Sequence, residues 1–480
     1  MFVSRLSKKF SPNPKRVILQ FFNPGSEQRI KNIIERVESL SEVEVVHHLE
    51  KIIQDFSFRH LNIKRKLIEN YNKVEKFITA QKNYTIERKY LLGAYFSKEY
   101  SIEAASLFNP SIVPHPDQSN LKPGMVRFIM SLRATGEGHI SSIEFRSGVI
   151  DENCEIFFDE TEKYCELPSQ KDGKIFSKYE LIERLKIEGC EEKKFLDNLP
   201  ESFSNQQINE LLVDELKKSP NQNIKNLIAQ ILEFVDANYE ITFPESISVS
   251  ARIIFPNSSK ESVGMEDARF VKFQDEGGSH TYYATYTAYN GRSFGTQLIE
   301  TKDFHNFKIK TLHGKAVQDK GMAIFPRKIN GKYVISSRQG GENLQIMFSD
   351  DLYNWEEYKL LQVPKEDWEF VQIGNCGSPI ETKHGWLLIT HAVGPFRRYT
   401  IGAILLDLND PSKVIGSLKS PLIEPLENER EGYVPNVVYS CGSMMHQDQL
   451  IIPYAMSDSY CGFAKVSLGE ILAKLLETNK

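Results

Sequence analysis

The sequence predicts a mainly β protein, a five-bladed β-propeller that carries an N-terminal helical arm and a helical insertion. From about residue 95, short β-rich runs alternate with turns containing Gly, Asn, Asp and Pro. Two segments of this region resemble each other at a separation of about 48 residues, which suits one propeller blade. Helical spacing of apolar residues is confined to about 26–90 and about 174–238. The β portion outside the second stretch has room for about five blades.

The first helical stretch predicts an arm comprising residues 1–90. Within it, Ser41 followed by Glu44 is a candidate capping box. Because an apolar stripe must be buried, we expect the arm to pack on the β domain, where it shapes the pocket rim or makes a homo-oligomer contact. The stripe consists of Ile30, Ile33, Ile34, Val37, Leu40, Val45, Leu49, Ile52, Ile53 and Phe56.

Residues 91–480 are predicted to form one β domain, interrupted by the insertion at about 174–238. Its internal repeat pairs Glu300-Thr-Lys-Asp-Phe-His-Asn-Phe with Phe348-Ser-Asp-Asp-Leu-Tyr-Asn-Trp. Each copy places an Asp where it accepts backbone hydrogen bonds in a turn, and an aromatic residue where it packs underneath. A pair of β-sandwiches would give similar strands without this spacing and is the alternative.

Composition limits the classes of partner. The 480 residues carry a net charge of −5, which argues against nucleic acid as the main ligand because phosphate binding needs a basic surface. No run approaches the length of a membrane span, and the N-terminus lacks a signal-peptide pattern, so we expect a cytoplasmic protein with no membrane partner. The six cysteines form no C-x-x-C pair and are expected to be free thiols.

The most informative stretch is Gly264-Met-Glu-Asp-Ala-Arg, which places two carboxylates and a guanidinium at the start of a strand. Alone, such a cluster is most often a surface ion pair. In a propeller, however, inner strands of different blades converge on one central pocket, so polar groups far apart in sequence share a site. Mixed acidic, basic and amide groups suit a sugar ligand, which needs paired donors and acceptors. The polar groups at strand ends are Asn109, Ser111, Arg133, Glu266, Asp267, Arg269, Lys320, Arg338, Glu381, His391 and Asp458.

The sequence lacks the motifs that indicate other kinds of catalytic site. There is no H-E-x-x-H, C-x-x-C or His-x-His cluster, so we predict neither a metal nor a cofactor. A G-x-S-x-G elbow and a P-loop are absent too. Glycoside cleavage needs one carboxylic acid and a second carboxylate, and Asp267 and Glu381 are plausible partners if two blades face each other.

These motifs, in this order, resemble glycoside hydrolase family 130, the β-mannoside phosphorylases and β-1,2-mannosidases built on a five-bladed propeller. The resemblance spans about residues 95–470, excluding the insertion. The matching stretches are Phe108-Asn-Pro-Ser, Ser131-Leu-Arg, Gly264-Met-Glu-Asp-Ala-Arg, Ala323-Ile-Phe-Pro-Arg-Lys-Ile-Asn-Gly-Lys-Tyr, Ser349-Asp-Asp-Leu-Tyr-Asn-Trp, Gly377-Ser-Pro-Ile-Glu-Thr-Lys-His-Gly-Trp-Leu-Leu-Ile-Thr-His, Gly402-Ala-Ile-Leu-Leu-Asp-Leu and Pro435-Asn-Val-Val-Tyr.

The resemblance implies roles for single residues. The family's general acid falls on Asp267, although Ala268 replaces the Pro of the family's E-D-P-R motif. Sugar contacts would fall on Asn109, Arg133 and Asp458. The family's phosphorylases typically read P-I-K-T, with a Lys that helps bind phosphate, where this chain has Glu381.

A carboxylate at position 381 repels phosphate and can take a proton from water instead. Lys320 and Arg338, at other positions expected to contact phosphate, are still basic and would keep Glu381 ionised. The resulting hypothesis is an inverting, exo-acting β-1,2-mannosidase, with Asp267 as general acid and Glu381 as general base.

Inversion predicts carboxyl groups roughly 6.5–9.5 Å apart. One alternative is a β-mannoside phosphorylase that produces α-mannose 1-phosphate, and a second is a non-catalytic glycan-binding propeller. The predicted substrate-binding residues are Asn109, Ser111, Arg133, Glu266, Arg269, Lys320, Arg338, His391 and Asp458.

Overall fold

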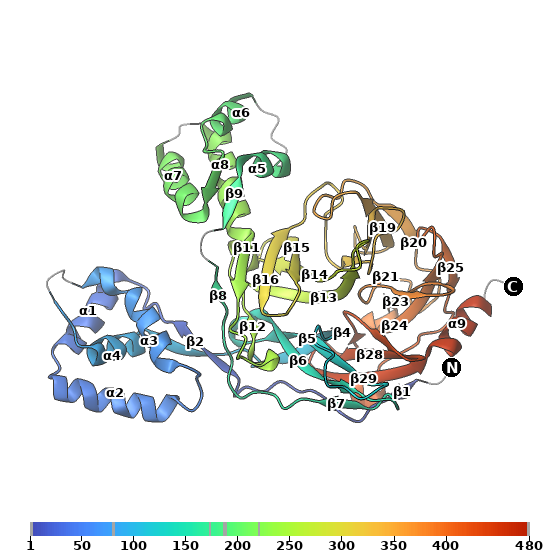
Figure 1. The fold of residues 1–480 in the computed structure, drawn as a ribbon, viewed down its shortest axis with the longest axis horizontal. Helices are drawn as coiled ribbons and strands as arrows, with labels where there is room; N and C mark the ends of the chain where they lie inside the picture. Colours follow the sequence, from blue (N-terminus) through green and yellow to red (C-terminus); the bar gives the residue numbers. More distant parts are fainter. Residues whose placement is uncertain (1–2, 79–81, 172–173, 186–189, 219–220, 478–480) are drawn as a thin grey trace.

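The computed structural model of the protein describes residues 3–78, 82–171, 174–185, 190–218 and 221–477. It consists of a large β body, a group of helices from the N-terminal part of the sequence beside it and a second group of helices above it (Figure 1). The predicted mainly β class is therefore confirmed. Among the described residues, none of the helices combines the length and apolar character needed to cross a membrane.

The helical arm has its own hydrophobic core and joins the β body through a two-stranded ladder. The arm's core residues include Ile34, Val45 and Leu91, all buried. The Ser41–Glu44 capping box is present at the start of the second helix. The arm comprises α1 (Glu27–Glu38), α2 (Glu42–Phe56), α3 (Ile63–Asn72) and α4 (Ile86–Tyr95), between the paired strands β2 (Val17–Phe21) and β3 (Ser97–Ser101).

A buried ionic network fixes the chain where it passes from the arm to the β body. Arg16 pairs with Glu103 at 2.7 Å and Glu144 at 2.8 Å, and Arg146 pairs with the same two carboxylates at 2.8 and 3.1 Å. All four side chains are buried. Breaking one partner of such a network leaves an uncompensated buried charge, so the network fixes the arm to the body strongly.

The second helical stretch also packs on itself. Leu181, Leu212, Ile228 and Phe203 share one buried cluster. The last helix leads directly into a strand of the β body. The stretch comprises β9 (Ile175–Ser177), α5 (Lys178–Leu185), α6 (Cys190–Asp197), β10 (Ser202–Ser204), α7 (Asn205–Lys218) and α8 (Gln222–Ala237).

The β body is built from antiparallel ladders of consecutive strands. A single pairing of Gly264 with Ser141 joins the first two ladders into an 11-stranded sheet. The first ladder holds β4 (Ser106–Pro114), β5 (Val126–Thr135), β6 (Ser141–Ile150), β7 (Ile156–Phe158) and β12 (Ile253–Ile254), and the second holds β13 (Gly264–Gln274), β14 (His280–Tyr289), β15 (Phe294–Thr301), β16 (Asn306–Thr311), β11 (Tyr239–Thr242) and β8 (Ser169–Gln170).

Three further sheets complete the β body in the described part of the chain. None of the sheets closes on itself there, so the five-bladed arrangement stays a prediction. The third ladder holds β17 (Ala323–Ile324), β18 (Tyr333–Ser337), β19 (Leu344–Ser349) and β20 (Lys359–Gln362); the fourth β21 (Gln372–Asn375), β22 (Ile380–Thr382), β23 (Gly385–Val393), β24 (Tyr399–Leu406) and β25 (Val414–Ser417); the fifth β26 (Val438–Tyr439), β27 (Met444–His446), β28 (Gln449–Met456), β29 (Tyr460–Ser467) and the N-terminal β1 (Ser4–Arg5), before α9 (Leu468–Glu477).

The internal repeat has the predicted local structure. Asp303 accepts backbone hydrogen bonds from the two residues that follow Phe304, and Asp351 accepts one from Tyr353. The aromatic residues that end the two copies, Phe307 and Trp355, are fully buried. Both predictions for the repeat are therefore confirmed.

The first strands of the ladders define two ends of the β body. Asn109 on β4 contacts Asp267 on β13, and further along the same two strands Ser111 contacts Phe270. The strands therefore run side by side in the same direction. We call the end at which Asp267 lies the site end, and the end toward which these strands finish the far end.

Candidate active site

Two β-bulges in neighbouring strands position Asp267. The register of β4 against β5 shifts after Phe108, and that of β13 against β14 shifts after Glu266. At these bulges Asn109 and Asp267 have left-handed φ angles of 49° and 57°, a conformation that Asn and Asp tolerate better than most residues. Asn109 Nδ2 donates to Asp267 Oδ1 at 2.7 Å. The bulges thus turn the two side chains toward each other.

Arg133 on β5 connects both carboxylates of the motif. Its guanidinium pairs with Asp267 Oδ1 at 3.2 Å and with Glu266 Oε1 at 2.8 Å. The second oxygen of Glu266 pairs with Lys320 Nζ at 3.0 Å, and this ammonium lies 4.0 Å from the centroid of the Phe294 ring. Charge-assisted bonds of this kind fix side-chain orientation.

The pKa of Asp267 lies below its usual range. Burial alone would raise this pKa, but the positive charges of Arg133 and Arg269 and the hydrogen bond from Asn109 outweigh burial. Asp267 is therefore ionised at neutral pH in the ligand-free protein. A role as general acid requires that a bound ligand change this balance.

A basic cluster, formed by Arg269, Arg338 and His391, lies beside Asp267. Arg269 donates to the backbone oxygen of Asp267 at 2.8 Å. A Cβ on Gly321 would lie 3.9 Å from Arg269 Nη2 and 4.0 Å from Arg338 Nε, so the two guanidiniums are close neighbours. Arg338 Nε is buried and has no hydrogen-bond partner among the described residues. Two neighbouring guanidiniums, one of which has an N–H without a hydrogen-bond partner, suit an anion that carries several oxygens.

A hydrogen bond with His391 positions the guanidinium of Arg338. His391 Nε2 lies 3.1 Å from Arg338 Nη1, and His391 Nδ1 lies 3.0 Å from the backbone oxygen of Asn375. Because a guanidinium only donates, Nε2 must accept and Nδ1 must carry the proton. Burial lowers the pKa of His391 well below its usual value, and Arg338 and Arg269 lower it further. The imidazole is thus neutral, and its buried side chain contacts Arg338 rather than open space.

Asp458 is a second carboxyl group within electrostatic reach of Asp267. It lies in the connection between β28 and β29 with a left-handed φ of 50°. Burial, and then the negative charge of Asp267, raise the pKa of Asp458 to about 6, although Arg133 and Arg397 oppose this shift. Asp458 therefore titrates close to neutral pH, unlike an ordinary aspartate.

The structure gives Ser111 a different partner from the predicted sugar. Its side chain is fully buried, and its Oγ accepts a hydrogen bond from the backbone N–H of Phe270 at 3.0 Å. This contact joins β4 to β13 just beyond the two bulges. The expected sugar contact is corrected: Ser111 positions the strand that carries Asp267.

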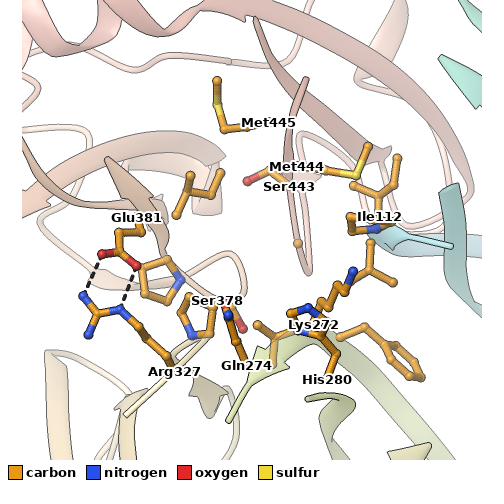
Figure 2. A pocket seen from close by; sticks show the side chains of 18 residues that line it. Ile112, Lys272, Gln274, His280, Arg327, Ser378, Glu381, Ser443, Met444 and Met445 are labelled. Atoms are coloured by element: carbon orange, nitrogen blue, oxygen red, sulfur yellow. Dashed lines mark hydrogen bonds and ion pairs between the residues drawn. The ribbon is translucent and has the colours of Figure 1, made fainter. Parts of the chain in front are cut away.

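The structure also corrects the expectation that Glu381 faces Asp267. The Glu381 carboxylate pairs with both Arg327 Nε at 2.8 Å and Arg327 Nη2 at 2.6 Å (Figure 2). Glu381 lines a cavity of about 370 Å³ at the far end. The β13 residues that line this cavity are Phe270, Val271, Lys272 and Gln274, and Asp267 is not among them. Arg327 therefore holds Glu381 in place of the predicted Lys320 and Arg338.

The physical reason is strand direction. Glu381 follows the end of β21, whereas Asp267 lies near the start of β13. Asn375 on β21 contacts Arg269, and Glu381, further along the chain, lines a cavity with later residues of β13, so β21 and β13 run in the same direction. A residue beyond the end of such a strand lies at the far end. The side chain of Glu381 is 41% exposed there, so its ion pair with Arg327 is open to solvent.

Two residues of the site were missed from the sequence. Asn375 Oδ1 accepts from Arg269 Nε at 3.3 Å, and Asn375 Nδ2 donates to the backbone oxygen of Gly321 at 2.6 Å. The Tyr439 hydroxyl accepts from Arg269 Nη2 at 2.6 Å. Tyr439 ends the family-like stretch Pro435-Asn-Val-Val-Tyr, so the sequence contained a signal for it. Asn375 lies just before the family-like stretch that begins at Gly377, and no motif pointed to it.

Nine of the predicted site residues thus share one connected region at the site end. Within the described residues, no three His, Cys, Asp or Glu side chains gather in a way that could hold a metal ion. The nine residues are Asn109, Arg133, Glu266, Asp267, Arg269, Lys320, Arg338, His391 and Asp458.

Comparison with known proteins identifies relatives of this chain. The sequence profile of glycoside hydrolase family 130, described as β-1,4-mannooligosaccharide phosphorylase, matches residues 225–477. A 1,2-β-oligomannan phosphorylase from Thermoanaerobacter sp. is 39% identical over 221 residues, which are 45% of this chain and 72% of the relative. A β-1,2-mannobiose phosphorylase from Listeria innocua is 32% identical over 229 residues, 46% of this chain and 63% of that relative.

The solved structure of the Listeria innocua β-1,2-mannobiose phosphorylase in complex with β-1,2-mannobiose is also similar. It is 22% identical, with a TM-score of 0.46, and the match covers 78% of this chain and 93% of that one. The family profile covers Asp267, Arg338, His391 and Asp458, whereas Asn109 and Arg133 precede the matched range. The family profile defines a carbohydrate-active enzyme. The chain belongs to glycoside hydrolase family 130.

Proposed function

We propose that this protein is an exo-acting β-mannoside phosphorylase, which cleaves β-1,2-linked manno-oligosaccharides with inorganic phosphate and releases α-mannose 1-phosphate. The observation that carries the proposal is the basic cluster beside Asp267, with two neighbouring guanidiniums and a buried donor of Arg338 that has no partner among the described residues. A dianion with several oxygens satisfies both guanidiniums at once. The β-1,2 linkage is supported by the two relatives, a 1,2-β-oligomannan phosphorylase and a β-1,2-mannobiose phosphorylase.

The position of Glu381 favours phosphorolysis over hydrolysis. An inverting hydrolase needs a carboxylate that activates water on the face of the sugar opposite the acid. Glu381 is held by Arg327 at the far end and lines a different cavity. Phosphate needs no such base because it is itself the nucleophile. The hydrolase hypothesis therefore lacks its predicted base, and the phosphorylase needs only the groups that surround Asp267.

The proposed reaction follows from these positions. A phosphate oxygen held by Arg269 and Arg338 attacks the anomeric carbon, and the bond from this carbon to the glycosidic oxygen breaks. Asp267 supplies the proton that the leaving oxygen takes up, directly or through a sugar hydroxyl. Attack from the opposite face inverts the configuration, so a β-mannoside gives an α-phosphate. Asn109, Arg133 and Asp458 hold the hydroxyls of the non-reducing mannose.

We also propose that the five ladders are the five blades of a propeller around this site. Supporting this, hydrogen bonds at or beside the first strands join the first ladder to the second, the second to the third, the third to the fourth and the fifth to the first. The N-terminal β1 also pairs with β29 of the last ladder, as expected if the chain ends close a ring. The far-end cavity is also lined by residues from every ladder. The connecting hydrogen bonds are Phe270 N to Ser111 Oγ, Gln274 N to Pro326 O, Asn375 Nδ2 to Gly321 O and Cys441 N to Pro110 O.

Phosphate dependence tests the proposal. β-1,2-Mannobiose is incubated with the protein with and without inorganic phosphate, and products are followed by proton and phosphorus NMR. We expect α-mannose 1-phosphate and free mannose only when phosphate is present. Mannose released without phosphate would establish a hydrolase instead. No turnover of any β-mannoside, with binding retained in Asp267→Asn, would indicate a glycan-binding protein.

A further inference from the structure

A second cavity, of about 490 Å³, lies at the site end around the β23–β24 connection of the fourth ladder. Its walls come from the β23–β24 connection, from the segment that leads into β21 and from the segment that leads into β26. Segments that lead into first strands lie at the same end as Asp267. The residues that matter for its chemistry are Trp368, Phe396, Arg398, Thr400, Glu424 and Asn436.

The cavity is close to the basic cluster. The Tyr399 ring stacks on the His391 ring with centroids 6.1 Å apart, and the Tyr399 N–H donates to the backbone oxygen of Asn436 at 3.0 Å. Asn436 lines the cavity, as do both chain neighbours of Tyr399. Arg397, in the same connection, is one of the charges that act on Asp458. The cavity and the basic cluster therefore both border the start of β24.

Two polar atoms of the lining residues are buried without a hydrogen-bond partner among the described residues, namely Thr400 Oγ1 and Arg398 Nε. Buried polar groups are nearly always hydrogen-bonded, and each exception needs a reason. The guanidinium of Arg398 also pairs with Glu424 Oε2 at 2.8 Å. The wall of the cavity therefore contains polar groups whose hydrogen-bonding capacity is not used up within the described residues.

An exposed aromatic ring stands at the edge of the cavity. Phe396 is 97% exposed and has a left-handed φ of 58°. Both an exposed aromatic ring and a left-handed backbone are unfavourable for phenylalanine, and the packing of the core does not require either. Trp368, in contrast, is fixed in the wall: its indole N–H donates to the backbone oxygen of Lys419 at 3.3 Å, and its ring packs against Gly402. A rigid wall and an open ring provide apolar faces for a sugar ring.

The charges of the lining balance, because it contains two carboxylates, Asp367 and Glu424, and two guanidiniums, Arg398 and Arg430. A balanced lining does not select a charged ligand and supplies the paired donors and acceptors that hydroxyl groups need. We propose that this cavity binds a sugar unit of the manno-oligosaccharide beyond the units held at Asp267, so that the protein prefers chains longer than the disaccharide. This inference rests on the proposed function.

The test compares chain lengths in variants of the full-length protein. Phe396→Ala and Thr400→Val are assayed by kcat/KM for phosphorolysis of β-1,2-mannobiose and β-1,2-mannotetraose. Phe370→Ala is the matched control, because Phe370 is 66% exposed in the same region and does not line the cavity. We expect both cavity variants to lower kcat/KM for the tetraose about tenfold, to leave the disaccharide within about twofold, and the control to change neither.

Equal losses for both substrates, or no loss for the tetraose, would overturn the inference. If the wild type turns over neither substrate, the proposed function fails, and the cavity is then tested by binding alone. Calorimetry with mannotetraose and Asp267→Asn, with and without Phe396→Ala, measures it directly. Affinity about tenfold weaker in the double variant supports the cavity, and unchanged affinity refutes it.

Discussion

Asn109 Nδ2 donates to Asp267 Oδ1 at 2.7 Å, and both residues have a left-handed φ at a β-bulge. The two bulges lie on parallel neighbouring strands, so the backbone of the β body, rather than a free loop, sets the position of the carboxylate. Strained backbone of this kind is concentrated at functional sites, where surrounding structure maintains it. The pair therefore links the fold of the two strands to the chemistry proposed for Asp267.

Removing the Asn109 amide should impair catalysis without unfolding the protein, provided that the new residue can adopt the left-handed φ of Asn109. Asn109→Gly tolerates a φ of 49°, whereas Asn109→Ala adds a strain of about 1 kcal/mol. We expect both variants to lose kcat by a similar factor, about 10- to 100-fold, because both free Asp267 to reorient. Both variants should show a lower free energy of unfolding, measured with chemical denaturant, because both lose the hydrogen bond to Asp267, and the alanine variant should show the larger decrease. Glycine retaining full activity would contradict the role of the amide.

Asp267→Asn should abolish the proton transfer and leave the fold intact. An amide keeps the shape of the side chain and its contact with Asn109, but it cannot supply a proton. We expect kcat to fall about 10²- to 10⁴-fold for unactivated mannosides. An activated aryl mannoside, whose leaving group needs no proton, should recover much of the loss. If both substrates suffered equally, Asp267 would act in binding and not as an acid.

Glu381→Gln should leave activity unchanged. The ion pair with Arg327 is exposed and lies at the far end, so its loss should change the free energy of unfolding by less than about 1 kcal/mol. Phosphate-dependent cleavage of mannobiose in this variant is the measurement. A fall of 100-fold or more in kcat, with normal stability, would restore Glu381 to the mechanism.

The contrast between Asp267 and Glu381 marks the limit of sequence reasoning here. Asp267 could be placed because the motif around it combines charge with a strand start, and these are local properties. Which end of the β body a strand-end residue occupies depends on strand direction and on the lengths of all intervening strands. Ser111 and Asn375 add a second lesson: short polar side chains that hold backbones together look the same in sequence as ligand-binding ones.

Asp458→Asn should stabilise the protein at neutral pH. The folded-state pKa of Asp458 is about 6, against an ordinary value of 3.8. Between pH 4 and 6 the folded protein holds a proton that the unfolded chain has released, so the stability contributed by Asp458 falls as the pH rises through this window. The full penalty, about 3 kcal/mol, persists above pH 6. We expect the variant to unfold at higher denaturant concentration at pH 7.5 and at an unchanged concentration near pH 4, while losing activity. Equal stability at both values would contradict the raised pKa.

Anion binding should draw a proton into the site. An anion bound between Arg269 and Arg338 offsets part of the positive charge that keeps Asp267 ionised, although Arg133 still acts on it. One unit of negative charge about 6 Å away raises a carboxyl pKa by roughly two units at an effective dielectric constant of about 20. Asp458, with its pKa of about 6, is the group closest to taking up a proton at pH 7. Because the anion binds the protonated site better, its affinity should fall as the pH rises from 6 to 8.

Sulfate is the probe for this coupling, since it does not itself titrate in that range. Calorimetric titration at pH 7 in two buffers of different ionisation enthalpy should show uptake of a fraction of a proton per sulfate bound. Asp458→Asn should reduce the uptake, and Glu381→Gln, which removes a carboxylate from the far end, should not. Identical heats in both buffers would show that the anion binds without any uptake of protons by the site. Asp267 would then have to receive its proton from the sugar, and phosphate would act as nucleophile alone.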